Sequence, residues 1–518
     1  MDRRTFYVTT PIYYVNSVPH LGTAYTTVAA DALARYRRSL GQDVRFVTGL
    51  DEHGQKVAQA AQEAGLTPQE WVDAVAPKFA EAWRMLEISN DDFIRTSEER
   101  HKRGVQAFWQ RLHDAGYLYQ GHYEGWYCVP CETYWAEDQI EEGLCPQCKR
   151  SVEFVREDNW FFKLSGFRER LLEHYDSHPA FVQPETRRNE VVSFVEGGLK
   201  DLSISRTTFA WGVPLPFAPG HVTYVWIDAL LNYITAVGYG DPDKEAEFER
   251  YWPADYHYVG KDIIRFHCVI WPAMLMAAGL ALPEHVFAHG FLLAKGEKMS
   301  KSKGNVVAPA DLVERFGVDA YRYYFLRDVR FGEDGSISME GMIQRYNGDL
   351  ANDWGNLVSR LFNMTEKYLG GIAPEPPRDE DSTADDLELR AVAEAVPARY
   401  DDAMSRLDYG AALEADWDLV KRANRYIEDA APWNLAKSAE DRPRLEAVLY
   451  NALEAVRIAA LFTAPVMPLT SAEVWRRLGV GDVHAVDDLA AEAAWGALPA
   501  GSRVVKGEVL FPRIVEEE

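Results

Sequence analysis

The chain has 518 residues, of which 47% are hydrophobic, so it can bury several cores and we expect about three domains. A formal net charge of −25 excludes a protein that coats DNA without sequence preference and predicts no DNA partner, whereas specific RNA binding needs only a local basic face. The longest apolar stretches, such as 271–282, are shorter than the roughly 18–20 residues that span a bilayer. The N-terminus also lacks an apolar signal segment, so we expect a cytoplasmic protein with no membrane partner.

The N-terminal part of the chain predicts a parallel strand–helix–strand unit. Residues 5–12 form an apolar run typical of a buried strand. After Gly22, apolar residues recur at spacings of three and four, which predicts an amphipathic helix that Gly41 ends. A second strand, 45–50, follows at once, and this order favours a parallel pair with a right-handed crossover. Ligands bind beyond the carboxyl ends of such strands, where the sequence places Tyr14, His20 and Asp51.

Residues 116–225 interrupt this pattern with cysteines, aromatic residues and turns, so we predict an insertion between two halves of the sheet. Two Cys-x-x-Cys pairs, separated by residues 132–144, have the spacing of a tetrahedral zinc knuckle made by Cys128, Cys131, Cys145 and Cys148. Disulfides are the poorer alternative in a cytoplasmic chain, and iron bound by four thiolates is the minor one. Because protein ligands fill all four positions, we expect one structural zinc ion per chain.

The α/β pattern resumes near residue 222 and continues through a lysine-rich loop at 298–302. From Leu350 onward, strand signals vanish and helical stripes predict helices over 387–406, 409–430 and 445–463. The expected fold is therefore α/β, with a Rossmann-like parallel-sheet catalytic domain, a zinc-bearing insertion and an all-α C-terminal domain. The predicted boundaries are 1–115 and 226–349 for the two halves of the catalytic domain, 116–225 for the insertion and 350–518 for the helical domain.

Two short motifs carry the chemistry, and both suit a nucleotide triphosphate that is attacked at phosphorus. In Pro19-His20-Leu21-Gly22-Thr23, His20 can donate to a phosphate oxygen, and Gly22 lets a nucleotide approach the backbone at a helix N-terminus. In Lys298-Met299-Ser300-Lys301-Ser302, the lysines can stabilise charge that builds up on the phosphates. A helix-capping histidine or a solvated lysine loop would explain either motif alone, whereas their order and contexts favour a shared site.

Together the two motifs resemble the paired signatures of the class I aminoacyl-tRNA synthetases, whose histidine motif is commonly His-Ile-Gly-His. Thr23 stands at the fourth position here, where its hydroxyl can donate to phosphate but carries no charge. The resemblance implies that the lysine loop closes over Mg²⁺-ATP during adenylate formation, with Lys301 as the main cation and Lys298 and His20 assisting. The ATP-binding residues that it implies are His20, Gly22, Thr23, Lys298, Ser300, Lys301 and Ser302.

Four further segments make essentially the whole chain similar to the methionyl-tRNA synthetases; they are 11–16, 49–54, 225–230 and 260–267. This resemblance implies that Asp51 contacts the ammonium group of methionine. The pocket that it implies is lined by Ile12, Tyr14, Trp226, Ala229, Leu230, Tyr233, Ile263 and His267. The residue types agree, because an aromatic wall suits a thioether and each sulfur–aromatic contact is worth about 0.3–1.5 kcal/mol. We expect His267 and Tyr14 to donate polar contacts near the sulfur, which disfavours leucine.

The resemblance implies a ligase that activates L-methionine with ATP to methionyl-adenylate. The acyl group would then pass to the 3′-terminal adenosine of tRNA(Met), including the initiator tRNA. The methionine carboxylate is the nucleophile, so catalysis requires positioning and charge stabilisation rather than a nucleophile from the protein. The C-terminal helices are similar to the family's anticodon-binding domain, in which Asn424 and Arg425 are candidate contacts. No appended dimerising domain is recognised, so we expect a monomer.

Several alternatives remain open at this stage. Synthetases for leucine, isoleucine or valine are much longer and carry an editing insertion, whereas the insertion here is short and carries cysteines. A cysteine-specific relative would bind its substrate through an active-site zinc, but these four cysteines form a closed set. A catalytically idle RNA-binding protein with this fold would be expected to lose its lysines. A nucleotidylyltransferase would leave the helical C-terminal domain unexplained.

Overall fold

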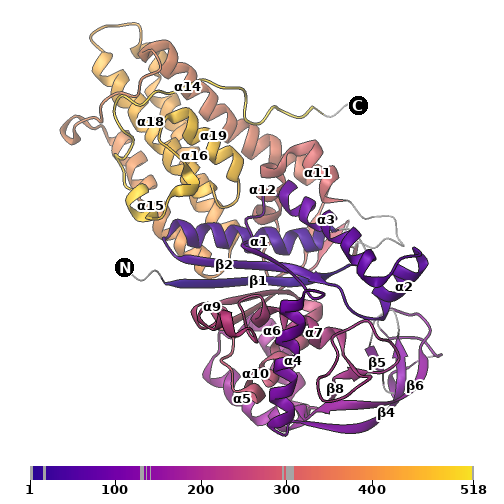
Figure 1. Cartoon of the computed structure of the whole chain (residues 1–518). Coiled ribbons are helices and arrows are strands. Elements are labelled where there is room, and N and C mark those ends of the chain that lie inside the picture. Colours follow the sequence, from indigo (N-terminus) through magenta and orange to yellow (C-terminus); the bar gives the residue numbers. More distant parts are fainter. Residues whose placement is uncertain are drawn as a thin grey trace.

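The computed structural model describes residues 4–15, 19–128, 133–135, 137–140, 142–146, 148–294, 297–298 and 308–515. Its centre is a parallel sheet of six strands in the order β3-β2-β1-β11-β12-β7 (Figure 1). The strands are β1 (Thr5–Tyr14), β2 (Asp43–Asp51), β3 (Asp92–Arg95), β7 (Val182–Gln183), β11 (Tyr256–Gly260) and β12 (His285–His289). The Rossmann-like class and the parallel pairing of β1 with β2 are thereby confirmed.

Helices cover both faces of this sheet (Figure 1). One face packs against α1 (Leu21–Ser39), α3 (Pro68–Met85) and α12 (Val318–Asp328), with α2 (Gln55–Glu63) beside α3. The other face packs against α4 (Glu99–Asp114), α7 (Val225–Leu230), α8 (Asn232–Thr235) and α10 (Trp271–Ala278), with α9 (Glu245–Tyr251) near β1. The predicted helix stop after α1 is present, because Gly41 has φ +76°, a conformation that glycine adopts without strain.

The predicted insertion contains an antiparallel sheet in the order β5-β4-β6-β8, at the end of the molecule opposite the C-terminal helices (Figure 1). Its elements are β4 (Leu118–Cys128), β5 (Thr133–Trp135), β6 (Glu153–Phe162), α5 (Arg168–Ser177), α6 (Glu185–Glu196), β8 (Leu202–Ser203), β9 (Ser205–Arg206) and β10 (Val222–Thr223). The short strand β7 also lies within 116–225, but it pairs with β12 at the edge of the central sheet. Part of this region therefore belongs to the central sheet rather than to a separate unit.

After β12 the chain forms a small sheet in the order β14-β13-β15. Its strands are β13 (Leu292–Ala294), β14 (Glu297–Lys298) and β15 (Gly335–Ile337), and the helices of this region are α11 (Pro309–Phe316), α12 and α13 (Met339–Arg345). A π-helical segment, η8 (Tyr346–Gly355), then leads into the C-terminal helices.

The described part of the C-terminal region is helical, as predicted. Its helices are α14 (Asn356–Leu369), α15 (Ala384–Ser405), α16 (Tyr409–Ala430), α17 (Pro432–Leu435), α18 (Arg442–Thr463), α19 (Pro468–Leu478) and α20 (Leu489–Glu492). The predicted segment 409–430 coincides with α16, and 387–406 and 445–463 fall on α15 and α18. Among the described residues, none of the helices combines the length and the apolar character needed to cross a membrane.

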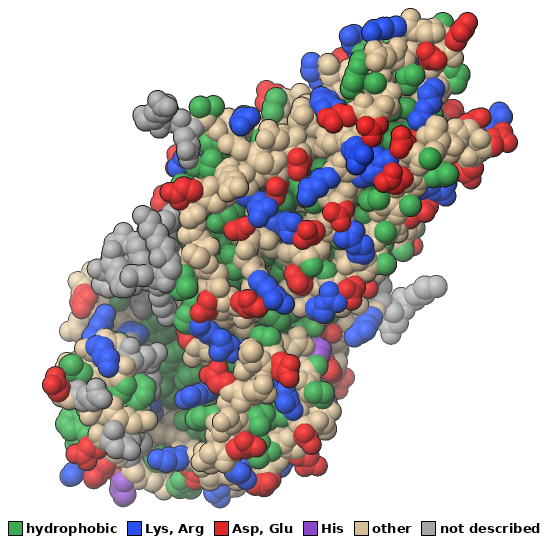
Figure 2. All heavy atoms as spheres, turned by 180° about the vertical axis from the view of Figure 1, so that it is seen from behind, with side chains coloured by type: hydrophobic (Ala, Val, Ile, Leu, Met, Phe, Trp, Pro, Cys, Tyr) green, Lys and Arg blue, Asp and Glu red, His purple; other side chains and the backbone are tan. Residues whose placement is uncertain are grey.

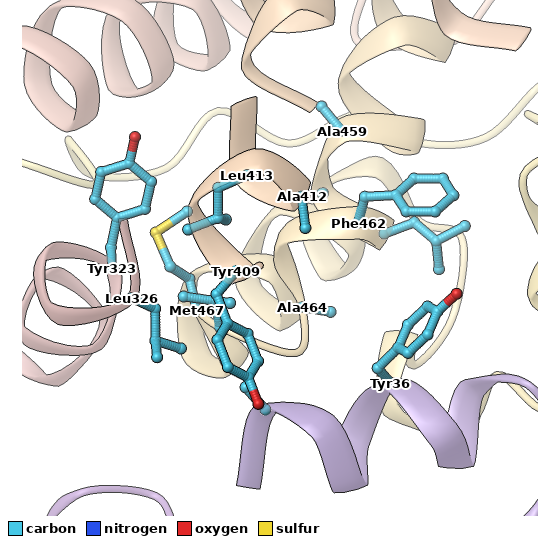
Figure 3. Packing of buried hydrophobic residues seen from close by; sticks show 14 of the residues in the cluster. Tyr36, Tyr323, Leu326, Tyr409, Ala412, Leu413, Ala459, Phe462, Ala464 and Met467 are labelled. Carbon is cyan, nitrogen blue, oxygen red and sulfur yellow. The ribbon is translucent and has the colours of Figure 1, made fainter. Parts of the chain in front are cut away.

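One hydrophobic core joins the α1 face of the sheet to the C-terminal helices. In Figure 3, Tyr36 of α1 lies below Phe462, and Ala464 and then Tyr409 are seen to its left. Tyr36 donates to Asp401 Oδ1 over 2.6 Å, and Tyr409 donates to the carbonyl of Ala29 over 2.7 Å. The helical domain is therefore packed directly onto α1.

A buried ion pair lies in the same junction. Arg322 of α12 is fully buried and donates to Asp31 Oδ2 of α1 over 2.6 Å. It also donates to the carbonyls of Pro465 and Val466, over 3.0 and 2.8 Å. Burial alone would raise the pKa of Asp31, but the guanidinium groups of Arg35 and Arg322 hold it well below its usual range. The two buried charges thus compensate each other, which is the condition for tolerating either one in a core.

Charges of both signs share the surface. On the face shown in Figure 2, Lys and Arg side chains intermix with Asp and Glu over the helical domain, while hydrophobic side chains line a hollow in the lower half. The electrostatic potential of this face therefore alternates between small positive and small negative areas, although the net charge of the chain is −25.

Candidate active site and metal centre

The carboxyl ends of three neighbouring strands carry, or lead into, several residues of the predicted amino-acid pocket. In the register of β1 with β2, Tyr14 lies opposite Asp51, two positions beyond the pair formed by Ile12 and Gly49. Strand β11 is the other neighbour of β1, and the chain that leaves it carries Ile263 and His267. Ile12, Tyr14 and Ile263 are half-buried, whereas Asp51 is 7% exposed. One carboxylate and several apolar surfaces thus meet at one edge of the sheet.

Helix α7 supplies an aromatic wall. The ring of Trp226 stacks on Phe266, with the centroids 4.6 Å apart and the planes 13° apart. Both rings are half-buried, as is Ala229, whereas Leu230 is buried. Sequence reasoning did not assign Phe266, although it lies inside the segment 260–267 that carried part of the resemblance. The stacked pair is a flat aromatic surface that includes Trp226, one of the aromatic residues that the resemblance implies for the pocket.

Tyr233 and His267 form a buried hydrogen-bonded chain that ends at the carbonyl of Ile263. The His267 Nδ1 atom lies 3.0 Å from the carbonyl oxygen of Ile263, which can only accept, so Nδ1 carries a proton. Burial lowers the pKa of His267 to about 4, so the neutral ring accepts the Tyr233 hydroxyl at Nε2 over 2.7 Å. Contrary to the expectation that His267 donates near a sulfur, its N–H is used by Ile263. The hydrogen bonds instead fix the orientation of Tyr233.

A cluster of buried polar residues that sequence reasoning did not assign lies next to Asp51. His53 Nδ1 is 2.6 Å from Asp228 Oδ2, and His101 Nε2 is 3.0 Å from Asp228 Oδ1. The other ring nitrogen of His101, Nδ1, is 2.8 Å from the hydroxyl of Thr235. His53 and Asp228 belong to the segments 49–54 and 225–230. Because these segments are far apart in the sequence, no sequence pattern indicates that the two side chains are in contact.

His20 caps the N-terminus of α1. Its Nδ1 accepts from the backbone N–H groups of Gly22 and Thr23, over 3.1 and 3.3 Å, so in a neutral ring the proton lies on Nε2. The Thr23 hydroxyl donates to the carbonyl of His20 over 2.8 Å and accepts from its N–H over 3.0 Å. A Cβ atom at Gly22 would lie 3.1 Å from Cε1 of His20, so the glycine makes room for the imidazole. In this tautomer Nε2 is the ring nitrogen that carries the proton and can act as a donor.

The lysine motif begins in a strand. Glu297 and Lys298 form β14, which pairs with β13, so that Lys298 lies opposite Leu293. The remaining predicted residues of this motif, Ser300, Lys301 and Ser302, lie outside the described residues.

Three of the four predicted zinc ligands come together at the tip of the insertion. The sulfur atoms of Cys128, Cys145 and Cys148 all lie within 4.8 Å of one another, and Cys128 Sγ lies 3.5 Å from Cys148 Sγ. Cys128 and Cys145 are fully buried, whereas Cys131 lies outside the described residues. These two cysteines and Val152 are the buried residues of a small hydrophobic core in the described part of the insertion. A three-thiol cluster of this kind could hold a metal ion, and so small a core profits from such a cross-link.

The two candidate RNA contacts on α16 differ in their surroundings. The Asn424 amide donates to the carbonyls of Asp353 and Val420, over 2.9 and 3.2 Å, so it fastens α16 to η8. Arg425 has a 78% exposed side chain, which lies 3.4 Å from a carboxylate oxygen of Asp429. Only Arg425 of this pair is placed to meet a partner from solvent.

Comparisons with known proteins match nearly the whole chain to methionine–tRNA ligases. Residues 6–154 and 148–362 match the family model "tRNA synthetases class I (M)", and residues 377–518 match "Anticodon binding domain of methionyl tRNA ligase". The chain is 50% identical over 519 residues to a methionine–tRNA ligase of Caldanaerobacter subterraneus subsp. tengcongensis, covering 100% of this chain and 80% of the relative. It is also 50% identical over 535 residues to a methionine–tRNA ligase of Streptomyces coelicolor, covering 99% and 97%.

A solved structure has the same architecture. It is the Mycobacterium tuberculosis methionyl-tRNA synthetase in complex with methionyl-adenylate, which superposes with a TM-score of 0.92 at 45% sequence identity. The match covers 98% of this chain and 100% of that one.

Proposed function

Because the chain belongs to the methionyl-tRNA synthetase family, we propose that the residues at the carboxyl ends of β1, β2 and β11 bind methionine beside ATP. The chain is a ligase that activates methionine with ATP to methionyl-adenylate and charges tRNA with it. The register that sets Tyr14 opposite Asp51 is the observation that best supports this location, and the hydrogen bond between His53 and Asp228 brings helix α7, which carries Trp226, to the end of β2. The relative that contains methionyl-adenylate has the same fold.

In the proposed methionine site, Asp51 pairs with the ammonium group, and the apolar side chains surround the thioether. The aromatic wall of Trp226 and Phe266 faces the sulfur, with Ile12, Tyr14, Ala229, Leu230, Tyr233, Ile263 and His267 completing the pocket. A flat wall on one side and a single carboxylate on the other fit an unbranched amino acid with one positive charge. Bound in this way, the methionine carboxylate is held ready to attack the α-phosphate of ATP.

In the proposed ATP site, His20 Nε2 donates to a phosphate oxygen, and Gly22 leaves room for the imidazole and the nucleotide. Lys298 and Lys301 stabilise charge on the phosphates as pyrophosphate leaves, assisted by Ser300, Ser302 and the Mg²⁺ that accompanies ATP. The Thr23 hydroxyl bonds to the His20 backbone, so its contribution to ATP binding includes holding His20 in place. No side chain needs to form a covalent bond to the substrate.

Amino-acid-dependent ATP–pyrophosphate exchange across the twenty amino acids, without tRNA, tests the proposal. We expect exchange with methionine alone. Trp226→Ala should raise the methionine KM about tenfold or more while the ATP KM stays the same, because one wall of the pocket is removed. Gly22→Ala should raise the ATP KM instead, because its Cβ displaces the His20 ring. If Trp226→Ala left the methionine KM unchanged, the proposed location of the pocket would be wrong.

The proposal includes one structural zinc ion, held by Cys128, Cys131, Cys145 and Cys148. The mutual approach of three of these sulfurs and the small core around them support it. A bound zinc ion cross-links the tip of the insertion and performs no chemistry on the substrate. Metal analysis of purified protein should give one zinc per chain, and much less than one would refute this part.

For the other substrate, we infer that the helical domain binds the anticodon region of tRNA(Met), initiator tRNA included, and that Arg425 contacts it. The match of residues 377–518 to an anticodon-binding domain and the exposure of Arg425 support this. The proposal also includes a cytoplasmic monomer and the domain boundaries predicted from the sequence. Light scattering tests the monomer, and Arg425→Ala should weaken aminoacylation without changing pyrophosphate exchange.

A further inference from the structure

The cluster of His53, His101 and Asp228 has a defined charge and a defined set of protons. Burial alone would raise the pKa of Asp228, but the two imidazoles that face it lower it to about 2, so its carboxylate is ionised at neutral pH. An ionised carboxylate only accepts hydrogen bonds, so the protons lie on Nδ1 of His53 and Nε2 of His101. Hydrogen bonds to a buried charge are among the strong ones, and leaving that charge without a partner is costly.

The cluster is closed against solvent and is fixed from more than one side. The exposed fractions are 0% for Asp228 and His101, 1% for the His53 side chain and 2% for Thr235. The hydroxyl of Thr235 holds the second nitrogen of His101, which ties α4 to α8. The ring of Trp211 packs edge-on against His53 at 5.3 Å, and its Nε1 donates to the carbonyl of Glu52 over 2.6 Å. None of these residues has a place in the proposed chemistry of methionine or ATP.

The position of the cluster relates it to the two ends of the amino-acid substrate. His53 follows Asp51 by two residues at the end of β2, and Asp51 is the proposed partner of the ammonium group. Asp228 stands on α7 between Trp226 and Ala229, which belong to the proposed wall around the thioether. The hydrogen bond from His53 to Asp228 therefore joins the residue group that binds the charged end of methionine to the one that binds its side chain.

We propose that Asp228 is a positioning residue that fixes α7 against the carboxyl end of β2 and so sets the distance between the ammonium-binding and thioether-binding parts of the pocket. This inference rests on the proposed location of the methionine site. It assigns no contact between Asp228 and a substrate. If the cluster is loosened, α7 can shift relative to Asp51, and we expect methionine binding to weaken. The ATP site at the start of α1 should keep its geometry, so ATP binding should change little.

The first test is Asp228→Asn, which preserves shape and removes the charge. An amide offers one acceptor oxygen where the carboxylate offers two, so one of the two histidines must lose its hydrogen bond or move its proton to the other ring nitrogen, which disturbs that nitrogen's own surroundings. In pyrophosphate exchange we expect the methionine KM to rise about tenfold or more, with the ATP KM within about twofold of wild type. Asp319→Asn is the matched control: this aspartate is also buried, accepts from the backbone N–H groups of Leu469 and Thr470, and lies in the junction with the helical domain. It should lower the melting temperature without changing the methionine KM.

A pair of variants at His101 keeps the inference testable if Asp228→Asn does not fold. His101→Gln retains an N–H donor near the position of Nε2, whereas His101→Leu removes it. The Leu variant should raise the methionine KM, and the Gln variant should restore most of the wild-type value. Equal KM values for the two variants, a folded Asp228→Asn protein with an unchanged methionine KM, or parallel rises of both KM values would each overturn the inference. An unchanged methionine KM in Trp226→Ala would instead show that the proposed methionine site is wrong. This variant therefore distinguishes failure of the site from failure of the positioning role of Asp228.

Discussion

Asp416 offers the sharpest test of the buried electrostatics in the helical domain. It lies on α16 with an exposed fraction of 0%, and within the described part of the chain neither of its carboxylate oxygens has a hydrogen-bond partner. The hydroxyl of Tyr400, whose pKa is raised first by burial and further by nearby groups that include Asp416, is likewise buried without a partner. Burial raises the pKa of Asp416 well above its usual value of 3.8.

The raised pKa makes the stability of the protein depend on pH. Between the pKa of the unfolded carboxyl and the raised pKa of the folded one, the folded state binds more protons than the unfolded state, so the free energy of unfolding falls as pH rises. The slope is about 1.4 kcal/mol per pH unit until the folded pKa is reached. Asp416→Asn is isosteric and cannot ionise. The free energy of unfolding of Asp416→Asn, relative to wild type, should therefore grow by about 1.4 kcal/mol per pH unit, which for a chain of this length is roughly 1 °C in melting temperature.

Urea titrations followed by far-UV circular dichroism at about pH 5, 6 and 7 measure this difference directly. Asp418→Asn is the matched control, because Asp418 lies two residues further along α16 with a 43% exposed side chain that pairs with Arg399. It should change the free energy of unfolding by less than about 0.5 kcal/mol at every pH. A constant difference between wild type and Asp416→Asn across the pH range would refute the reasoning, because it would show that Asp416 is equally ionised in the folded and unfolded states.

Three further outcomes are expected. Lys301→Ala should slow adenylate formation by about 10²-fold or more with little change in methionine KM, and near-normal turnover in pyrophosphate exchange would contradict the assigned role. Cys128→Ser should abolish stoichiometric zinc and make the insertion sensitive to proteolysis, whereas Cys268→Ser, which changes a buried thiol outside the cluster, should retain zinc. Arg322→Leu should cost about 3–5 kcal/mol of stability at neutral pH, because Asp31 keeps its charge but loses this buried partner. The loss should shrink at low pH, where Asp31 becomes protonated, and a loss that does not vary with pH would mean that packing alone causes it.

The spacing of apolar residues predicted the long helices and strands, whose pattern lies within one continuous segment. The apolar run at 5–12, the helix that Gly41 ends and the segment 409–430 all correspond to observed elements, because burial of one face repeats along each of them. The two-residue strand β7 could not be predicted, since its existence depends on pairing with β12 about one hundred residues later.

The site was predictable to the extent that it lies in short motifs. Tyr14, Asp51 and Trp226 fall in contiguous segments, and strand order alone places the first two at one edge of the sheet. The contact between His53 and Asp228 spans 175 residues, and no local pattern reports it. The second ring of the aromatic wall, Phe266, was missed for the same reason: its partner Trp226 belongs to a different element, and only the fold brings the two together.

The continuous core between α1 and the C-terminal helices determines how the enzyme can meet a nucleic acid as long as a tRNA. Arg322 is bonded to Asp31 on one side and to Pro465 and Val466 on the other, so a rotation at this contact would break hydrogen bonds of a buried charge. The distance from the strand ends to the far end of the helical domain is therefore held by the buried contacts of this junction. We therefore expect a tRNA that contacts both regions to meet them at a separation that the buried contacts of the protein hold constant.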